Sequence, residues 1–144
     1  MAVKSSTGLK NGILVSGSLK SMLDGGKIRI FSGAAPADAD AAETGTLLCV
    51  ISNGGTATGL TFEATAAGGT VAKKSGEEWS GTNVAGGTAS YYRFVAAGDT
   101  GAASTTEKRL QGTVDLVGAD MNLSSITLTS GVPQTIDTYF ATVL

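Results

Sequence analysis

Residues 87–100 read GTASYYRFVAAGDT, and this stretch decides the fold class. Side chains alternate along an extended strand, so Tyr92 and Phe94 share one face while Tyr91 and Arg93 share the other. Aromatic residues favour strands and supply much of a core's buried area. We therefore predict a strand whose Tyr92 and Phe94 point into a core. Tyr91 and Arg93 would lie on the outer face, either solvated or in a protein contact.

Further strand-like segments, separated by Gly-rich turns, lie on both sides of this strand. KIRIFS (27–32) alternates, and TLLCVIS (46–52) is a nearly continuous apolar run, typical of a strand buried on both faces. EKRLQGTVDLV (107–117) is a strand with room for a bulge at Gly112. Roughly eight or nine short strands with such turns predict an antiparallel sandwich or barrel.

The C-terminal stretch PQTIDTYFATVL (133–144) also alternates. Its pattern predicts that Ile136 and Phe140 share one face, and that Tyr139 lies on the opposite face. Tyr139 is therefore a candidate for an exposed ring that contacts a partner.

The first 26 residues have a different pattern. Residues 1–16 show no regular helical or strand pattern, and we predict an extended arm. Ser18 is placed to cap one short helix that Gly25 and Gly26 would end. The arm either buries apolar side chains against an adjacent subunit, covers its own domain or stays disordered. The apolar residues in question are Val3, Leu9, Ile13 and Leu14.

Composition excludes several classes of protein. The chain has 144 residues, which suits one domain, and its 42% hydrophobic content and net charge of −2 exclude a disordered chain. With 10 basic and 12 acidic residues, it lacks the positive excess of nucleic-acid binders. No apolar run resembles a signal peptide or approaches the roughly 20 residues that span a bilayer. We expect a soluble protein that contacts neither nucleic acid nor membrane.

The sequence contains few of the residues that enzymes use for catalysis. The chain has no histidine, which removes the commonest general base, the usual triads and most zinc sites. The single cysteine, Cys49, lies in an apolar run and cannot form an intrachain disulfide, which fits a reducing cytosol. The acidic loop with Asp38, Asp40 and Glu43 is interpreted as solvated rather than calcium-binding. We expect no enzyme activity, no metal and no cofactor.

One possible carboxylate pair remains, Glu77 and Glu78 beside Trp79. Adjacent strand residues point to opposite faces, so this pair does not form the two-carboxylate site of a glycosidase. We interpret the segment as a surface hairpin that carries a core tryptophan.

From Lys27 to the C-terminus, the sequence resembles a family of small tailed-phage virion proteins. The segments that carry the resemblance are KIRIFSGAAPADADAAETGTLL, LTF, GEEWSG, GTASYYRFVA, DTG, RLQGTV, GADMNL and PQTID. The chain is also similar in size and composition to jelly-roll cement, or decoration, proteins, which clamp the outer surface of phage capsids. The resemblance implies no catalytic residues, and residues 1–26 lie outside it.

We therefore expect an all-β protein, with an N-terminal arm and short helix over residues 1–26 and an antiparallel, jelly-roll-like β-sandwich over residues 27–144. The expected function is that of a capsid cement protein. It would be assembled in the host cytoplasm, bind the phage major capsid protein on the capsid exterior, and act as a homo-oligomer, with a dimer favoured. The candidate partner-binding residues are Val3, Leu9, Ile13, Leu14, Tyr91, Arg93 and Tyr139.

Two alternatives remain open. The first is another station in the virion, as a tail, connector or baseplate component. The second is a carbohydrate- or receptor-binding module, which would expose Trp79, Tyr91 or Tyr139 in a shallow site for sugar stacking.

Overall fold

The computed structural model describes residues 3–142, and over this range the chain is an all-β, sandwich-like protein with two short helices. The helices are α1 (Thr7–Val15) and α2 (Leu19–Leu23). The strands are β1 (Lys4–Ser5), β2 (Lys27–Phe31), β3 (Leu47–Asn53), β4 (Thr70–Ala72), β5 (Trp79–Thr82), β6 (Gly87–Thr88), β7 (Tyr91–Val95), β8 (Arg109–Asp115), β9 (Met121–Asn122), β10 (Thr127–Leu128), β11 (Pro133–Ile136) and β12 (Phe140–Thr142).

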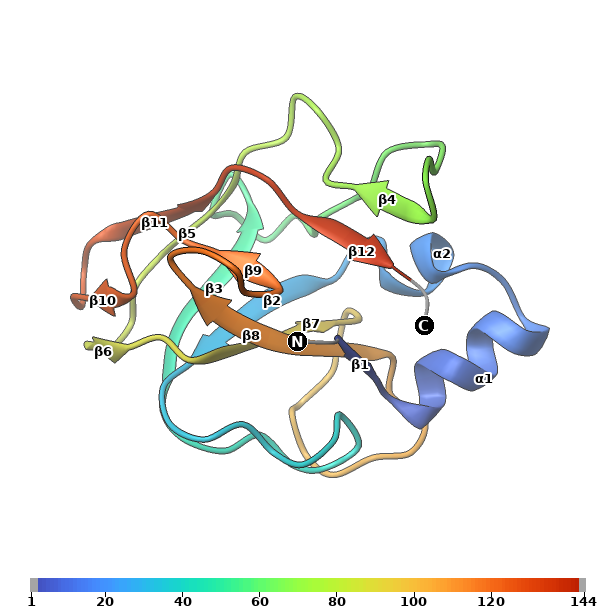
Figure 1. Ribbon diagram of the computed structural model, residues 1–144, viewed down its shortest axis with the longest axis horizontal. Helices are drawn as coiled ribbons and strands as arrows, with labels where there is room; N and C mark the ends of the chain where they lie inside the picture. Colours follow the sequence, from blue (N-terminus) through green and yellow to red (C-terminus); the bar gives the residue numbers. More distant parts are fainter. Residues whose placement is uncertain (1–2, 143–144) are drawn as a thin grey trace.

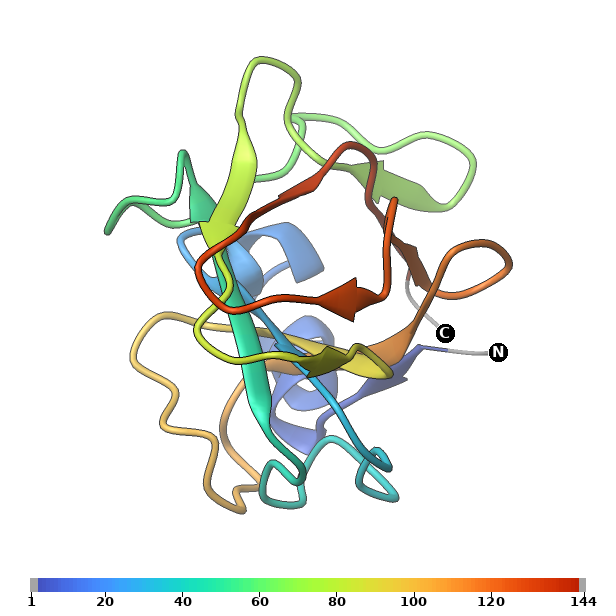
Figure 2. The ribbon, with the colours of Figure 1, turned by 90° about the vertical axis from the view of Figure 1, so that its left-hand side faces the viewer.

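One hydrogen-bonded path connects most of the strands, in the order β1-β8-β7-β2-β3-β5-β11, and β9 pairs with β8 as the eighth strand. The pairs along the path are antiparallel, whereas β9 is parallel to β8. The path curls back on itself, and the ladders β10-β6 and β12-β4 lie beside it (Figure 2). In Figure 1, β4, β11 and β12 form a layer above β2, β7 and β8.

An aromatic core lies inside this curled sheet. Phe94 of β7 stacks on Phe62 at 5.3 Å between ring centroids, and Trp79 meets Phe94 edge-on at 5.9 Å. The hydroxyls of Tyr92 and Tyr139 form a hydrogen bond of 2.7 Å. The prediction that Tyr92 and Phe94 point into the core is confirmed.

Tyr139 differs from its sequence expectation, because its side chain is only 3% exposed. The alternation that was expected to run through residues 133–144 is interrupted, since β11 ends at Ile136 and β12 begins only at Phe140. Across this break Ile136 and Tyr139 are both buried, and Phe140 becomes an exposed ring. Tyr139 is therefore a core residue and has no free face for a partner.

The pairing of β7 with β8 is regular through Tyr92 and Gly112, without the bulge expected at Gly112. This glycine meets a requirement for space, because a Cβ at Gly112 would lie 2.7 Å from Cε1 of Tyr92. The register shift in this part of the sheet instead separates Ile30 from Phe31, where β2 pairs with β3.

Residues 7–15, expected to be extended, instead form α1. Ser6 caps this helix, since its hydroxyl accepts a hydrogen bond from the Leu9 N–H at 3.2 Å. β1 extends the main sheet by pairing with β8. The predicted short helix is confirmed as α2, which begins after a Ser18 capping box and ends before Gly25. The first part of the chain thus covers its own domain.

Candidate functional site

The adjacent carboxylates Glu77 and Glu78 are engaged in local structure. The Glu77 carboxylate accepts hydrogen bonds from the N–H and hydroxyl of Thr61 and from Nε1 of Trp79. Burial alone would raise the pKa of Glu77, but these hydrogen bonds outweigh it and hold the pKa below its ordinary value. Glu78 bonds separately to the Ser80 hydroxyl, at 3.0 Å. The two carboxylates therefore have separate structural partners.

The acidic loop has the same character. Asp40 accepts hydrogen bonds from the N–H and hydroxyl of Thr7, at 2.7 and 2.6 Å, and these bonds lower the pKa of Asp40. Glu43 forms an ion pair with Arg29 at 2.8 Å. Within residues 3–142, no three His, Cys, Asp or Glu side chains lie together as ligands for a metal ion.

Two loops cover the outer face of the sheet. The β2–β3 loop (32–46) and the β7–β8 loop (96–108) lie on the side of β2, β7 and β8 that faces away from β4 and β12 (Figures 1 and 2). Arg109 of β8 contacts both loops, since its guanidinium donates to the backbone carbonyls of Ala39 and Ala102. Arg109 therefore attaches both loops to the sheet.

Arg109 also forms a two-pronged ion pair with Asp99 of the β7–β8 loop, at 2.6 and 2.9 Å. The side chains are 1% and 0% exposed, respectively. Burial alone would raise the pKa of Asp99, but the hydrogen bonds from Arg109 and from the Gly101 N–H lower it below its ordinary value. The pair is a charged crosslink inside the protein.

Tyr91 and Arg93 were expected on an open outer face, but the β2–β3 loop buries them to 1% and 0% exposure. Arg93 donates to the Gln111 side chain and to the Asp38 carbonyl. The Tyr91 hydroxyl donates to the Thr44 carbonyl at 2.5 Å. We call these two residues, with Arg109, Gln111 and Asp99, the buried polar layer. It is a structural element, and it presents no contact surface in the single chain.

The remaining residues of the sequence-based site divide by burial. Leu9 is buried in the core, and Val3 and Ile13 are half-buried against it. Leu14 is 78% exposed, and the structure adds Val15, which is 85% exposed. We call Leu14 and Val15 the helix tip, because they end α1. Val15 was not among the residues singled out from the sequence; the apolar run ILV (13–15), followed directly by SGS (16–18), is the signal in the sequence that marks this feature.

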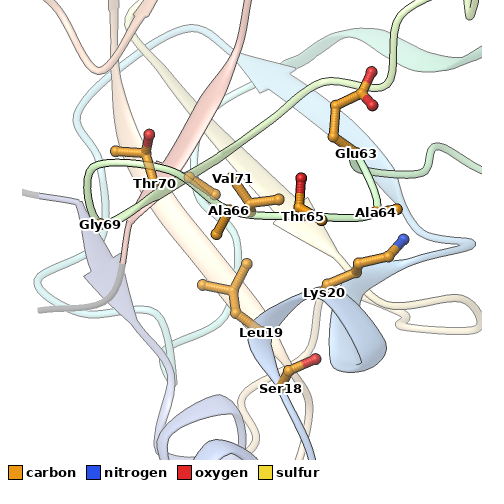
Figure 3. Close-up of a pocket in the computed structure, with 11 residues that line it drawn as sticks. Ser18, Leu19, Lys20, Glu63, Ala64, Thr65, Ala66, Gly69, Thr70 and Val71 are labelled. Atoms are coloured by element: carbon orange, nitrogen blue, oxygen red, sulfur yellow. The ribbon is translucent and has the colours of Figure 1, made fainter.

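An apolar pocket of about 300 Å³ lies beside the second helix, and we call it the α2 pocket. It is bordered by α2, β4, β12 and the segment that precedes β4. Figure 3 shows Leu19 of α2 pointing toward Val71 and Ala66, with Lys20 and Glu63 at one end. Ala141 of β12 also lines it. Sequence patterns did not predict this pocket, because its walls come from segments far apart in the chain.

Other large apolar side chains are exposed at separate places. They are Val84, Leu116, Val117, Val132 and Phe140. Single exposed apolar residues are routine in monomeric proteins, whereas contiguous apolar patches mark contact sites. Leu116 and Val117 are the two neighbours in sequence within this set.

Comparisons with known proteins add no relative. A scan of protein-family models finds no match, and neither the curated proteins nor the solved structures include a significant match. Neither helix in residues 3–142 has the length and apolar character needed to cross a membrane.

Proposed function

We propose that this protein is a non-enzymatic structural protein of a tailed-phage virion, which binds the major capsid protein on the outer surface of the head and cements neighbouring subunits. The observation that carries the proposal is the distribution of polar and apolar side chains between the interior and the surface. Arg93, Arg109 and Asp99 are enclosed in the buried polar layer. At the surface, by contrast, two adjacent apolar pairs are exposed, Leu14–Val15 and Leu116–Val117. Such a surface suits contacts with several neighbours at once.

The mechanism we propose is mechanical. A cement protein must transmit load between the subunits it contacts. Arg109 suits that purpose because it holds the β7–β8 loop through its ion pair with Asp99 and the β2–β3 loop through a hydrogen bond to the Ala39 carbonyl. Each apolar contact contributes modestly, at about 25 cal/mol per Å² of apolar area removed from water. Simultaneous attachment at several points then gives tight retention, because every contact after the first is effectively intramolecular.

The test compares particles assembled with and without the protein. DNA release on heating, followed with a DNA-binding dye, should occur at a lower temperature in particles that lack it. Particles reconstituted with a Leu116→Asp/Val117→Asp variant should show an intermediate temperature if this turn contacts the capsid. Equal heat resistance with and without the protein would contradict the cement role.

A station in the tail, connector or baseplate is the alternative within the virion. Copy number distinguishes the two, since a shell protein is present in hundreds of copies and a connector protein in far fewer. The carbohydrate-binding alternative loses its basis, because Trp79, Tyr91 and Tyr139 are all buried and offer no ring for sugar stacking.

A further inference from the structure

We propose that the chain forms a two-fold dimer in which the helix tip of each copy inserts into the α2 pocket of the other. The tip is an apolar projection without cover, since Leu14 and Val15 are both largely exposed. The pocket is an apolar hollow without an occupant among residues 3–142. A single chain thus carries both halves of one contact.

The tip is held in a fixed position, as an inserting group must be. A Cβ at Gly8 would lie 2.3 Å from the Thr106 carbonyl oxygen, so α1 packs directly on the backbone of the β7–β8 loop. A Cβ at Gly12 would lie 2.8 Å from Sδ of Met22, so α1 also packs closely on α2. These glycines fix the tip relative to the helix that borders the pocket.

The pocket matches the tip in size and chemistry. Its volume of about 300 Å³ is at the lower end of the range for ligand sites and suits two branched aliphatic side chains. Leu19, Val71 and Ala141 supply an apolar lining. Two charged side chains lie at its edge, and both already have partners that the tip would not displace. Lys20 is paired with Asp24, and the Glu63 carboxylate accepts a hydrogen bond from the Ser75 N–H.

Tip and pocket occupy the same side of the molecule, which favours a second copy over any other occupant. Only the short segment 16–18 separates α1 from α2, and in Figure 1 both helices and β4 lie on the right-hand side. A two-fold axis between them makes the two insertions equivalent, as in isologous dimers, where one patch serves both subunits. In such a dimer both tips and both pockets are occupied, so no further copy can be added through this contact. This inference does not depend on the capsid role.

The experiment measures molar mass by sedimentation equilibrium over a range of protein concentrations. The wild type should form a dimer, and Leu14→Asp/Val15→Asp should weaken association by at least about tenfold. Ala66→Trp, which fills the pocket from an exposed position, should do the same. Val84→Asp/Val132→Asp is the matched control and should leave the dimer intact, since β5 and β11, the strands beside this pair, lie on the far side of the molecule from α1 in Figure 1. Circular dichroism checks that each variant is folded.

Mixing the two deficient variants provides a second readout. One keeps its pocket and the other keeps its tip, so the mixture should form a heterodimer with one insertion, weaker than the wild type. A wild type that stays monomeric, or a tip variant that still dimerises, overturns the proposal. The proposal is also overturned if the wild type is monomeric and Leu14→Asp/Val15→Asp abolishes binding to the capsid. The helix tip would then be a capsid contact.

Discussion

The contact between Asp99 and Arg109 joins two opposite charges that have lost almost all contact with water. Asp99→Ala should lower the free energy of unfolding by about 3–5 kcal/mol, because it leaves a buried guanidinium without its counter-charge. Urea denaturation gives this value. Glu43→Gln is the control, since its ion pair with Arg29 is partly exposed and should contribute at most about 1 kcal/mol. Equal losses in both variants would refute the structural importance of the buried pair.

A second residue-scale prediction concerns the hydroxyls of Tyr92 and Tyr139, which bond only to each other at 2.7 Å among the described contacts. Either single Tyr→Phe substitution should cost about 1–3 kcal/mol, because the remaining hydroxyl is left buried and unpaired. The double variant should lose less than the sum of the two, since it leaves neither hydroxyl behind. A double-mutant cycle from denaturation curves measures this coupling, and simple additivity would count against it.

At the scale of elements, each helix is capped by a serine, but the cap of α1 is buried and the cap of α2 is exposed. Ser6 is buried, and its hydroxyl accepts from the N–H groups of Leu9 and Arg109 while donating to the Glu107 carbonyl. Ser6→Ala should therefore cost at least about 2 kcal/mol, the upper end for a cap. Ser18→Ala removes the exposed cap of α2 and should cost about 0.5–1 kcal/mol. Unfolding curves of both variants test this order, and the reverse order would contradict it.

The elements also show how far sequence patterns reach. The alternation in β2 and β7 predicted strands, because burial on one pleated face leaves a period of two. The continuous apolar run of β3 predicted a strand buried on both faces. α1 was not predicted, because Gly8 and Gly12 disfavour a helix in isolation and are accommodated by tertiary contacts that no local pattern records. The buried polar layer was missed for a related reason. Nothing local to Arg93 indicates that a loop some fifty residues earlier, at Asp38, will cover it.

The candidate site was predicted only in part. Leu14 was named from its apolar neighbours and is exposed, whereas Leu9, in the same segment, is buried. In α1, Leu9 and Leu14 lie on different faces of the helix. An extended arm, which was expected from the sequence, does not define these helical faces. The α2 pocket needs β4, β12 and α2 to meet, so it exists only in the folded chain.

For the whole molecule, we predict that stability is lost in acid. Asp99 and Glu77 both have pKa values below their ordinary values of 3.8 and 4.5. Folding therefore favours their ionised forms, and their contribution is fully present above those ordinary values. It disappears as the pH falls through the lower pKa values of the folded protein.

Denaturant unfolding between about pH 7 and about pH 2 would measure this loss. Asp99→Asn should be less stable at neutral pH and should show a weaker decline in acid. If the decline of this variant matched that of the wild type, the ion pair would not be the source of the acid sensitivity.

The burial of Cys49 has a practical consequence. The side chain is enclosed in the core, and desolvation raises the pKa of its thiol to about 11, so maleimide dyes will not modify it at neutral pH. It is the only sulfhydryl in the chain. A Val84→Cys variant would thus carry one reactive handle at an exposed place away from the helix tip, and a fluorophore attached there could be followed by single-particle microscopy without background from the native protein.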